Sequence, residues 1–76
     1  MTNNEKMYRL LALYSDGSTY EENDFDDLED MELSLSAYAN LFFHSTVLEC
    51  NNCTIEGVKA YVNGEVYEQL GDTKKL

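Results

Sequence analysis

Apolar residues near the N-terminus predict a strand that is followed by a second, shorter strand. Residues 7–14 are almost wholly apolar, and Asp16-Gly17 follows them closely. Asp-Gly is frequent in tight turns because glycine adopts a positive φ at no steric cost. We therefore expect a hairpin in which a strand over Met7–Tyr14 pairs with a return strand over Ser18–Glu22.

A second hairpin is predicted near the C-terminus. The runs Val58–Val62 and Glu65–Leu70 flank Asn63-Gly64, a dipeptide that tolerates positive φ at both central positions of a type I′ turn. A two-residue loop also sets Lys59 opposite Glu68, and such an opposite-charge pair supports this register. The expected cross-strand partners are Val62 with Glu65, Tyr61 with Val66, Ala60 with Tyr67 and Lys59 with Glu68.

Between the hairpins, apolar residues recur three and four positions apart, as they do on one face of a helix. We expect a helix from about Asp26 to His44, with Asp24 as its N-cap and Asp27 at the third helical position. Residues 31–41 also alternate as a strand would, but no β-branched residue occurs over residues 21–44 and the composition favours a helix. The apolar stripe consists of Leu28, Met31, Leu35, Tyr38, Ala39 and Phe42.

These elements predict an α+β protein of ββαββ order, with one helix packed on one face of a four-stranded antiparallel sheet. A chain of 76 residues without Pro or a Gly/Ser linker is expected to be a single domain over residues 1–76. Its ordered core is expected to span about residues 6–71, followed by a frayed tail over Asp72–Leu76. The segment Thr46–Thr54 stays open between an extension of the helix, an extra strand and a loop.

Charge changes this picture more than composition does. The formal net charge is −10, and no Lys or Arg occurs between Leu10 and Val58, a stretch that carries −11. Six Tyr and three Phe argue against a disordered acidic tail. The lack of bases argues against direct binding of nucleic acid or of an anionic membrane. With no signal-peptide pattern and no long apolar run, we expect a cytoplasmic protein.

The candidate chemistry is sparse. Cys50 and Cys53 have the spacing of a redox pair or of half a zinc site, and His44 is the nearest further ligand. Two reduced thiols, a disulfide and a metal site all stay open. The acids do not follow the pattern of an EF-hand loop, and no two of them form a recognisable catalytic pair. We expect no cofactor and no bound metal, and a protein that is not an enzyme.

The acidic residues are concentrated in one short segment. Eight of them fall within twelve residues, and repulsion within pairs such as Glu22–Asp26 and Asp26–Asp30 is not relieved by a nearby base if the helix starts early. An acidic helix rises about 1.5 Å per residue, close to the charge spacing of duplex DNA at about 1.7 Å. We therefore interpret these residues as a binding surface for a basic partner: Glu21, Glu22, Asp24, Asp26, Asp27, Glu29, Asp30 and Glu32.

A second predicted surface is apolar. Leu33, Ala37 and Leu41 lie on a helical stripe opposite the core stripe. The expected register also places Tyr61 and Val66 on the sheet face that carries Lys59 and Glu68. These residues leave a homodimeric structural or interaction module without an inhibitory role as the alternative function.

The order of hairpin, acidic loop, helix and Asn63-Gly64 hairpin resembles small acidic inhibitors that phages and mobile elements encode. These include anti-CRISPR proteins and DNA-mimic antirestriction proteins. The resemblance covers size, charge and element order, and it matches no individual residue. It implies an inhibitor that acts in the cytoplasm of a bacterial host and occupies the nucleic-acid cleft of a defence enzyme. The implied partner is a basic host protein, such as a nuclease or its nucleic-acid complex.

Overall fold

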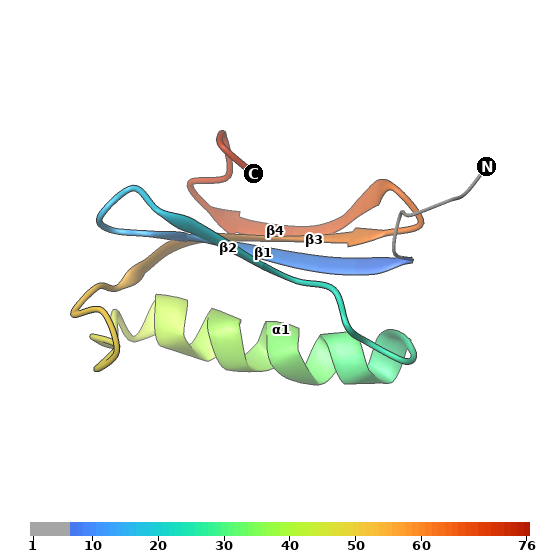
Figure 1. Cartoon of the computed structure of the whole chain (residues 1–76), viewed down its shortest axis with the longest axis horizontal. Coiled ribbons are helices and arrows are strands. Elements are labelled where there is room, and N and C mark those ends of the chain that lie inside the picture. Colours follow the sequence, from blue (N-terminus) through green and yellow to red (C-terminus); the bar gives the residue numbers. More distant parts are fainter. Residues whose placement is uncertain (1–6) are drawn as a thin grey trace.

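The computed structural model describes residues 7–76 and confirms the predicted α+β fold (Figure 1). All strand pairs are antiparallel, in the sheet order β2-β1-β3-β4, and α1 packs on one face of the sheet. The expected start of the ordered core at residue 6 lies outside the described residues. The elements are β1 (Tyr8–Tyr14), β2 (Thr19–Glu22), α1 (Leu28–Phe43), β3 (Ile55–Val62) and β4 (Glu65–Gly71).

The core lies between α1 and the two central strands. Met31 of α1 is fully buried against Leu10 of β1 and against Val58 and Ala60 of β3. Val58 and Ala60 are two positions apart in β3, and Leu10 pairs directly with Ala60, so all three side chains point to the same face of the sheet. Leu41 was expected on the opposite, exposed stripe of the helix, and this expectation is wrong because Leu41 packs against the core. The main hydrophobic core thus lies on the helix-facing side of the sheet.

The helix begins later than the sequence suggests. It starts at Leu28, and its N-cap is Asp27, whose carboxylate accepts a hydrogen bond of 2.9 Å from the Asp30 amide. The predictions of Asp24 as N-cap and of a helix starting at Asp26 are wrong. Phe25 explains the shift, because it packs against the core and keeps the chain out of the helix until after it.

The C-terminal hairpin has the predicted turn but only part of the predicted register. Asn63 and Gly64 have φ values of 54° and 82°, as a type I′ turn requires. Glu65 and Val66 then pair with Val62 and Tyr61, as expected.

A β-bulge at Tyr67 changes the remainder of that register. Ala60 lies opposite Glu68, and Lys59 lies opposite Gln69, so the predicted pairs Ala60–Tyr67 and Lys59–Glu68 are wrong. Glu68 is consequently not on the face that carries Lys59. The extra residue places Tyr67 beside α1, where its hydroxyl donates a hydrogen bond to Glu32.

The segment between α1 and β3 is a loop. The helix ends at Phe43 with His44 as its C-cap, and the loop contains one isolated bridge between Leu48 and Cys53. The positive φ of Asn52, 55°, belongs to the turn inside this bridge. Residues 46–54 therefore form neither a helical extension nor a further strand of the sheet.

The C-terminal tail, Asp72–Leu76, was expected to be frayed, but it folds back over the sheet face opposite α1 (Figure 1). The Asp72 amide donates to the carbonyl of Glu56 at 2.9 Å, and the Tyr61 hydroxyl donates to the carbonyl of Leu76 at 2.8 Å. We call this face the outer face. The tail gives it partial cover, which the sequence did not predict.

Candidate functional site

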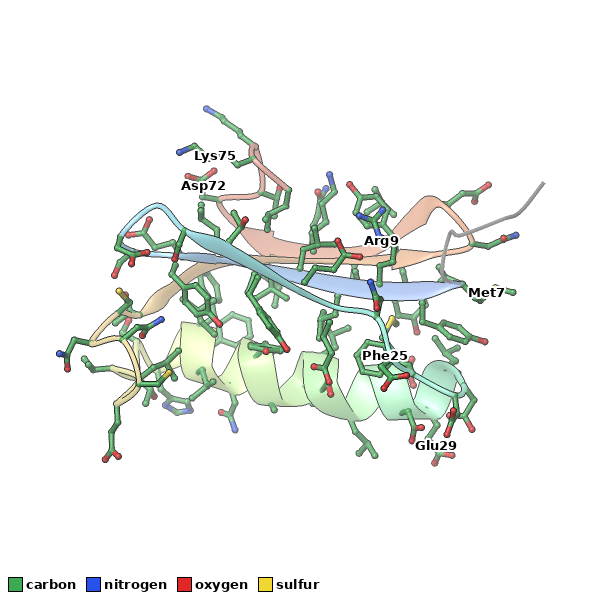
Figure 2. All side chains as sticks on the ribbon, viewed as in Figure 1. Met7, Arg9, Phe25, Glu29, Asp72 and Lys75 are labelled. Atoms are coloured by element: carbon green, nitrogen blue, oxygen red, sulfur yellow. The ribbon has the colours of Figure 1, made fainter. Side chains whose placement is uncertain are left out.

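Among residues 7–76, the basic side chains lie on the outer face of the sheet. Arg9 and Lys59 both contact the ring of Tyr61, at 5.1 Å and 5.2 Å from its centroid. The tail that carries Lys74 and Lys75 crosses the same face (Figure 2). Among residues 7–76, the helix side of the sheet therefore holds no Lys or Arg, whereas it holds most of the acidic segment.

Strand β2 separates two of the predicted acids. Successive residues of a strand point to opposite faces, so Glu21 lies on the outer face and Glu22 on the helix side. The Arg9 guanidinium donates two hydrogen bonds to the Glu21 carboxylate, at 2.8 Å and 3.1 Å. Hydrogen bonds from Arg9, and then from Asn23, hold the pKa of Glu21 below its usual value. Glu21 is thus paired, and it does not share a surface with the remaining acids.

Five exposed carboxylates surround the start of α1, and we call this surface the acidic end. Asp27 caps the helix, and the acids of the first turn also interact favourably with the positive end of the helix dipole. Glu29, labelled in Figure 2, points away from the sheet. The acidic end consists of Asp24, Asp26, Asp27, Glu29 and Asp30.

Glu32 lies on α1 beside β4. Its carboxylate accepts a hydrogen bond from the Tyr67 hydroxyl. This hydrogen bond raises the pKa of the Tyr67 phenol, and desolvation and the negative charges of Glu32 and Glu68 raise it further. Glu32 therefore extends the negative surface from the helix towards the edge of the sheet.

The geometry changes the mimicry argument. Asp26 precedes the helix, so neither Glu22–Asp26 nor Asp26–Asp30 spans a helical turn. Of the eight predicted residues, only Glu29, Asp30 and Glu32 lie within α1. A phosphate-like row of carboxylates along a helix is thus limited to little more than one turn. The acids instead form a compact group at one end of the molecule.

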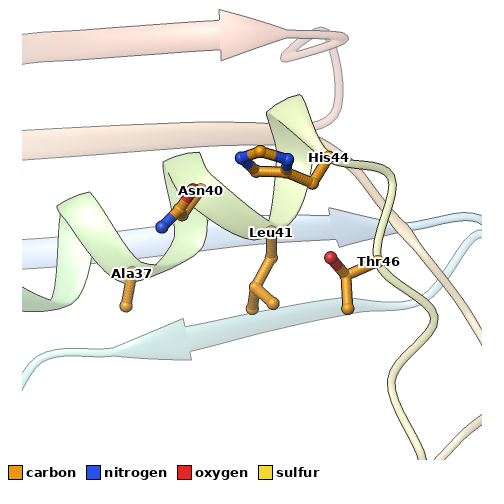
Figure 3. Close-up of a pocket in the computed structure, with 5 residues that line it drawn as sticks. All are labelled: Ala37, Asn40, Leu41, His44 and Thr46. Carbon is orange, nitrogen blue, oxygen red and sulfur yellow. The ribbon is translucent and has the colours of Figure 1, made fainter.

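Two adjoining hollows lie along α1, and Ala37 and Leu41 line both of them. The first has a volume of about 440 Å³ and reaches His44 at the end of the helix (Figure 3). In Figure 3 the side chains of Ala37, Leu41 and Thr46 point to the same side of the helix.

The second hollow lies between α1 and the β1–β2 hairpin, and we call it the tyrosine groove. Its volume is about 410 Å³. Tyr20, which pairs opposite Ala12, also points to this side of the sheet. The groove is lined mainly by Tyr14, Glu22, Tyr38, Leu41, Leu48 and Cys50.

The phenols of the groove are close enough to affect one another. Burial, followed by the charges of Tyr14, Tyr20 and Glu22, raises the pKa of Tyr38 to about 12. Burial, followed by the nearby Cys50 and Tyr20, also raises the pKa of Tyr14. Both phenols are therefore neutral at physiological pH, and the charge at the groove is that of Glu22.

The two thiols occupy different environments. Cys53 is buried; its amide donates a hydrogen bond to the Asn51 side-chain oxygen at 3.1 Å, and its thiol donates to the Asn51 carbonyl at 3.2 Å. Cys50 is exposed at the groove, and both thiols are free. No group of three potential metal ligands occurs within residues 7–76, and His44 serves as the C-cap of α1.

Sequence reasoning missed the tyrosine groove. Tyr38 was predicted on the core stripe and Tyr14 in a strand, and both predictions are correct. Neither prediction indicated that the two residues line a common groove. The available signal was the alternation Tyr20–Glu22 in the return strand, which places an aromatic ring and a carboxylate on one face.

Comparison with known proteins adds no relative: the chain matches no family model, no curated protein and no solved structure. Within the described residues, α1 is too short and too polar to cross a membrane.

Proposed function

We propose that this chain is a small acidic inhibitor, encoded by a phage or another mobile element. In this proposal it binds a basic, nucleic-acid-binding defence enzyme in the cytoplasm of a bacterial host. The acidic end of α1 enters the cleft that normally holds phosphates, and its carboxylates pair with Arg and Lys of that cleft. The chain acts by occupation of the cleft and catalyses no reaction.

One observation supports the proposal: within residues 7–76, no Lys or Arg lies on the helix side of the sheet to balance the acids there. Protein surfaces that serve only solubility usually intersperse both signs of charge. In the part of the chain that the structure describes, the bases contact Tyr61 or belong to the tail on the outer face, and none of them lies at the acidic end. A compact negative surface on a rigid helix start attracts a basic cleft at long range and speeds association.

The test begins with the immobilised chain and a bacterial lysate at low salt. Each captured protein is identified by mass spectrometry and purified, and its binding to duplex DNA is measured with increasing amounts of the chain. We expect a nucleic-acid-binding protein whose DNA binding is lost at a one-to-one ratio. We also expect its complex with the chain to weaken steeply as salt rises.

Two matched variants decide whether the acidic end is responsible. The triple change Asp26→Asn, Asp27→Asn and Asp30→Asn removes three charges and retains an N-cap side chain. We expect about a tenfold or larger loss of affinity. The control variant Glu49→Gln, Glu56→Gln and Asp72→Asn removes the same charge elsewhere and should bind nearly as well as the parent. Equal binding by the parent and the acidic-end variant would contradict the proposal.

A homodimeric module is the second candidate, and exposed apolar side chains favour it. Leu33 and Phe43 of α1 are both 68% exposed, and Val47 in the following loop is 59% exposed. Sedimentation equilibrium at tens of micromolar distinguishes the two, because an obligate dimer would show twice the mass of the chain.

A further inference from the structure

We propose that the tyrosine groove is a binding site for one arginine side chain of a basic partner, held between Tyr38 and Glu22. This inference rests on the proposed function for the origin of the arginine, and it names the contact that anchors the partner. The groove lies on the helix side of the sheet, separate from the acidic end.

The lining of the tyrosine groove combines aromatic and acidic residues. The residues that line the hollow include two with aromatic rings, Tyr14 and Tyr38, and one with a carboxylate, Glu22. A cation over an aromatic face is attracted by the electrons of the ring, and arginine is the side chain that most often does this in proteins. The planar guanidinium also matches a carboxylate through two parallel hydrogen bonds.

Among residues 7–76, the Lys and Arg side chains lie away from the tyrosine groove. Arg9 and Lys59 contact Tyr61 on the outer face, and the tail with Lys74 and Lys75 crosses that face as well. On the outer face, the Tyr61 ring is thus in contact with two cations of the same chain. On the helix side, the tyrosine groove has aromatic rings and a carboxylate, but no Lys or Arg among residues 7–76 contacts them.

The volume of the tyrosine groove and the charge of its lining residues also suit an arginine side chain. A hollow of about 410 Å³ falls within the usual range of small-ligand sites, about 300–1,000 Å³. The phenols of Tyr14 and Tyr38 are neutral at physiological pH, so among these lining residues Glu22 is the one with a carboxylate to pair with a cation. The apolar wall formed by Leu41 and Leu48 suits the methylene stem of a long side chain.

The experiment needs no identified partner. The ¹⁵N-labelled chain is titrated with N-acetyl-arginine methylamide, and amide and tyrosine ring shifts are followed by NMR. N-acetyl-citrulline methylamide, which has the same shape without the charge, and N-acetyl-lysine methylamide are titrated in parallel. We expect saturable millimolar binding of the arginine probe, with shifts at Tyr14, Glu22 and Tyr38, and binding about threefold or more weaker for the other two probes.

Variants assign the binding to the groove. Glu22→Gln removes the carboxylate charge, and Tyr38→Leu removes the ring; each should weaken the arginine probe about threefold or more. Tyr38→Phe keeps the ring and should bind like the parent, which controls for folding. Glu29→Gln removes the same charge at the acidic end and should change binding less than twofold.

The inference is overturned if citrulline or lysine binds as tightly as arginine, or if Glu29→Gln weakens binding as much as Glu22→Gln does. The outcomes of the two proposals are separable. If arginine binds at the groove but capture of the partner does not depend on the acidic end, the arginine site is supported and the proposed function is contradicted. If capture depends on the acidic end but arginine does not bind, the proposed function is supported and the arginine site is contradicted.

Discussion

Tyr38 illustrates how one residue serves both the fold and the candidate site. It belongs to the apolar stripe of α1 and packs against the core, yet its ring also lines the tyrosine groove. The same burial that stabilises the ring disfavours the ionised phenolate, so its pKa rises to about 12.

This shift predicts a loss of stability in alkali. In the folded chain the phenol of Tyr38 stays protonated to about pH 12, whereas in the unfolded chain it ionises near pH 10. The stabilising contribution is therefore complete below pH 10 and is lost as the pH rises through about 12. We expect a slope below about 1 kcal/mol per pH unit from this residue, because it is only half-buried.

Urea denaturation followed by circular dichroism at pH 8, 9, 10 and 11 measures the effect. The free energy of unfolding of the Tyr38→Phe variant should decrease less than that of the parent above pH 10. Parallel decreases in the two proteins would show that Tyr38 does not contribute.

At the scale of the elements, the start of α1 determines where the acids lie. Because the helix starts at Leu28, Asp24 and Asp26 lie in the preceding loop and Asp27 becomes part of the helix cap. The position of the helix cap, and not only the number of acids, therefore determines which carboxylates form the acidic end.

The cap gives a direct prediction for stability. Asp27→Ala removes the side chain that accepts the hydrogen bond from the Asp30 amide, and it should lower the free energy of unfolding by about 1 kcal/mol. Asp24→Ala removes the same charge from the loop and should cost less than about 0.5 kcal/mol. Chemical denaturation of both variants at the same salt concentration compares them. A larger loss for Asp24→Ala would favour the earlier helix start.

The order and type of the elements could be predicted, but their exact limits could not. The hairpin turn at Asn63-Gly64 and the helical stripe are local patterns, and local patterns are visible in a single sequence. The bulge at Tyr67 leaves no mark in the local pattern, and the contact that accompanies it joins β4 to Glu32, 35 residues away in the sequence. The shift from Asp24 to Asp27 likewise depends on the packing of Phe25 against a core that exists only in the folded chain.

The candidate site divides in the same way. The concentration of acids could be read from the sequence, but the separation of Glu21 from Glu22 required the strand register. The tyrosine groove joins β1, β2, α1 and the following loop, so no local segment contains its signal.

At the scale of the molecule, the tail makes the fold more than two layers. Leu13 is only 3% exposed although it lies on the outer face opposite Gly57. A Cβ added at Gly57 would lie 1.7 Å from the carbonyl oxygen of Asp72, so the tail approaches the strand where only glycine leaves room.

Gly57→Ala should therefore displace the tail and lower the free energy of unfolding by about 1–3 kcal/mol. The same substitution in a chain that ends at Gly71 should cost much less, because the clashing carbonyl is absent. Urea denaturation of the four proteins of this cycle measures the coupling, and NMR shifts of residues 72–76 report the displacement. An equal cost in both lengths of chain would show that the tail is not the cause.

Within residues 7–76 the bases lie on the outer face and most of the acidic segment lies on the helix side, so this part of the molecule has an electric dipole moment across the sheet. A uniformly acidic particle is pulled towards a positively charged cleft but arrives in any orientation. A dipolar one also experiences a torque, so it turns while it is still in solution and approaches with the start of α1 in front.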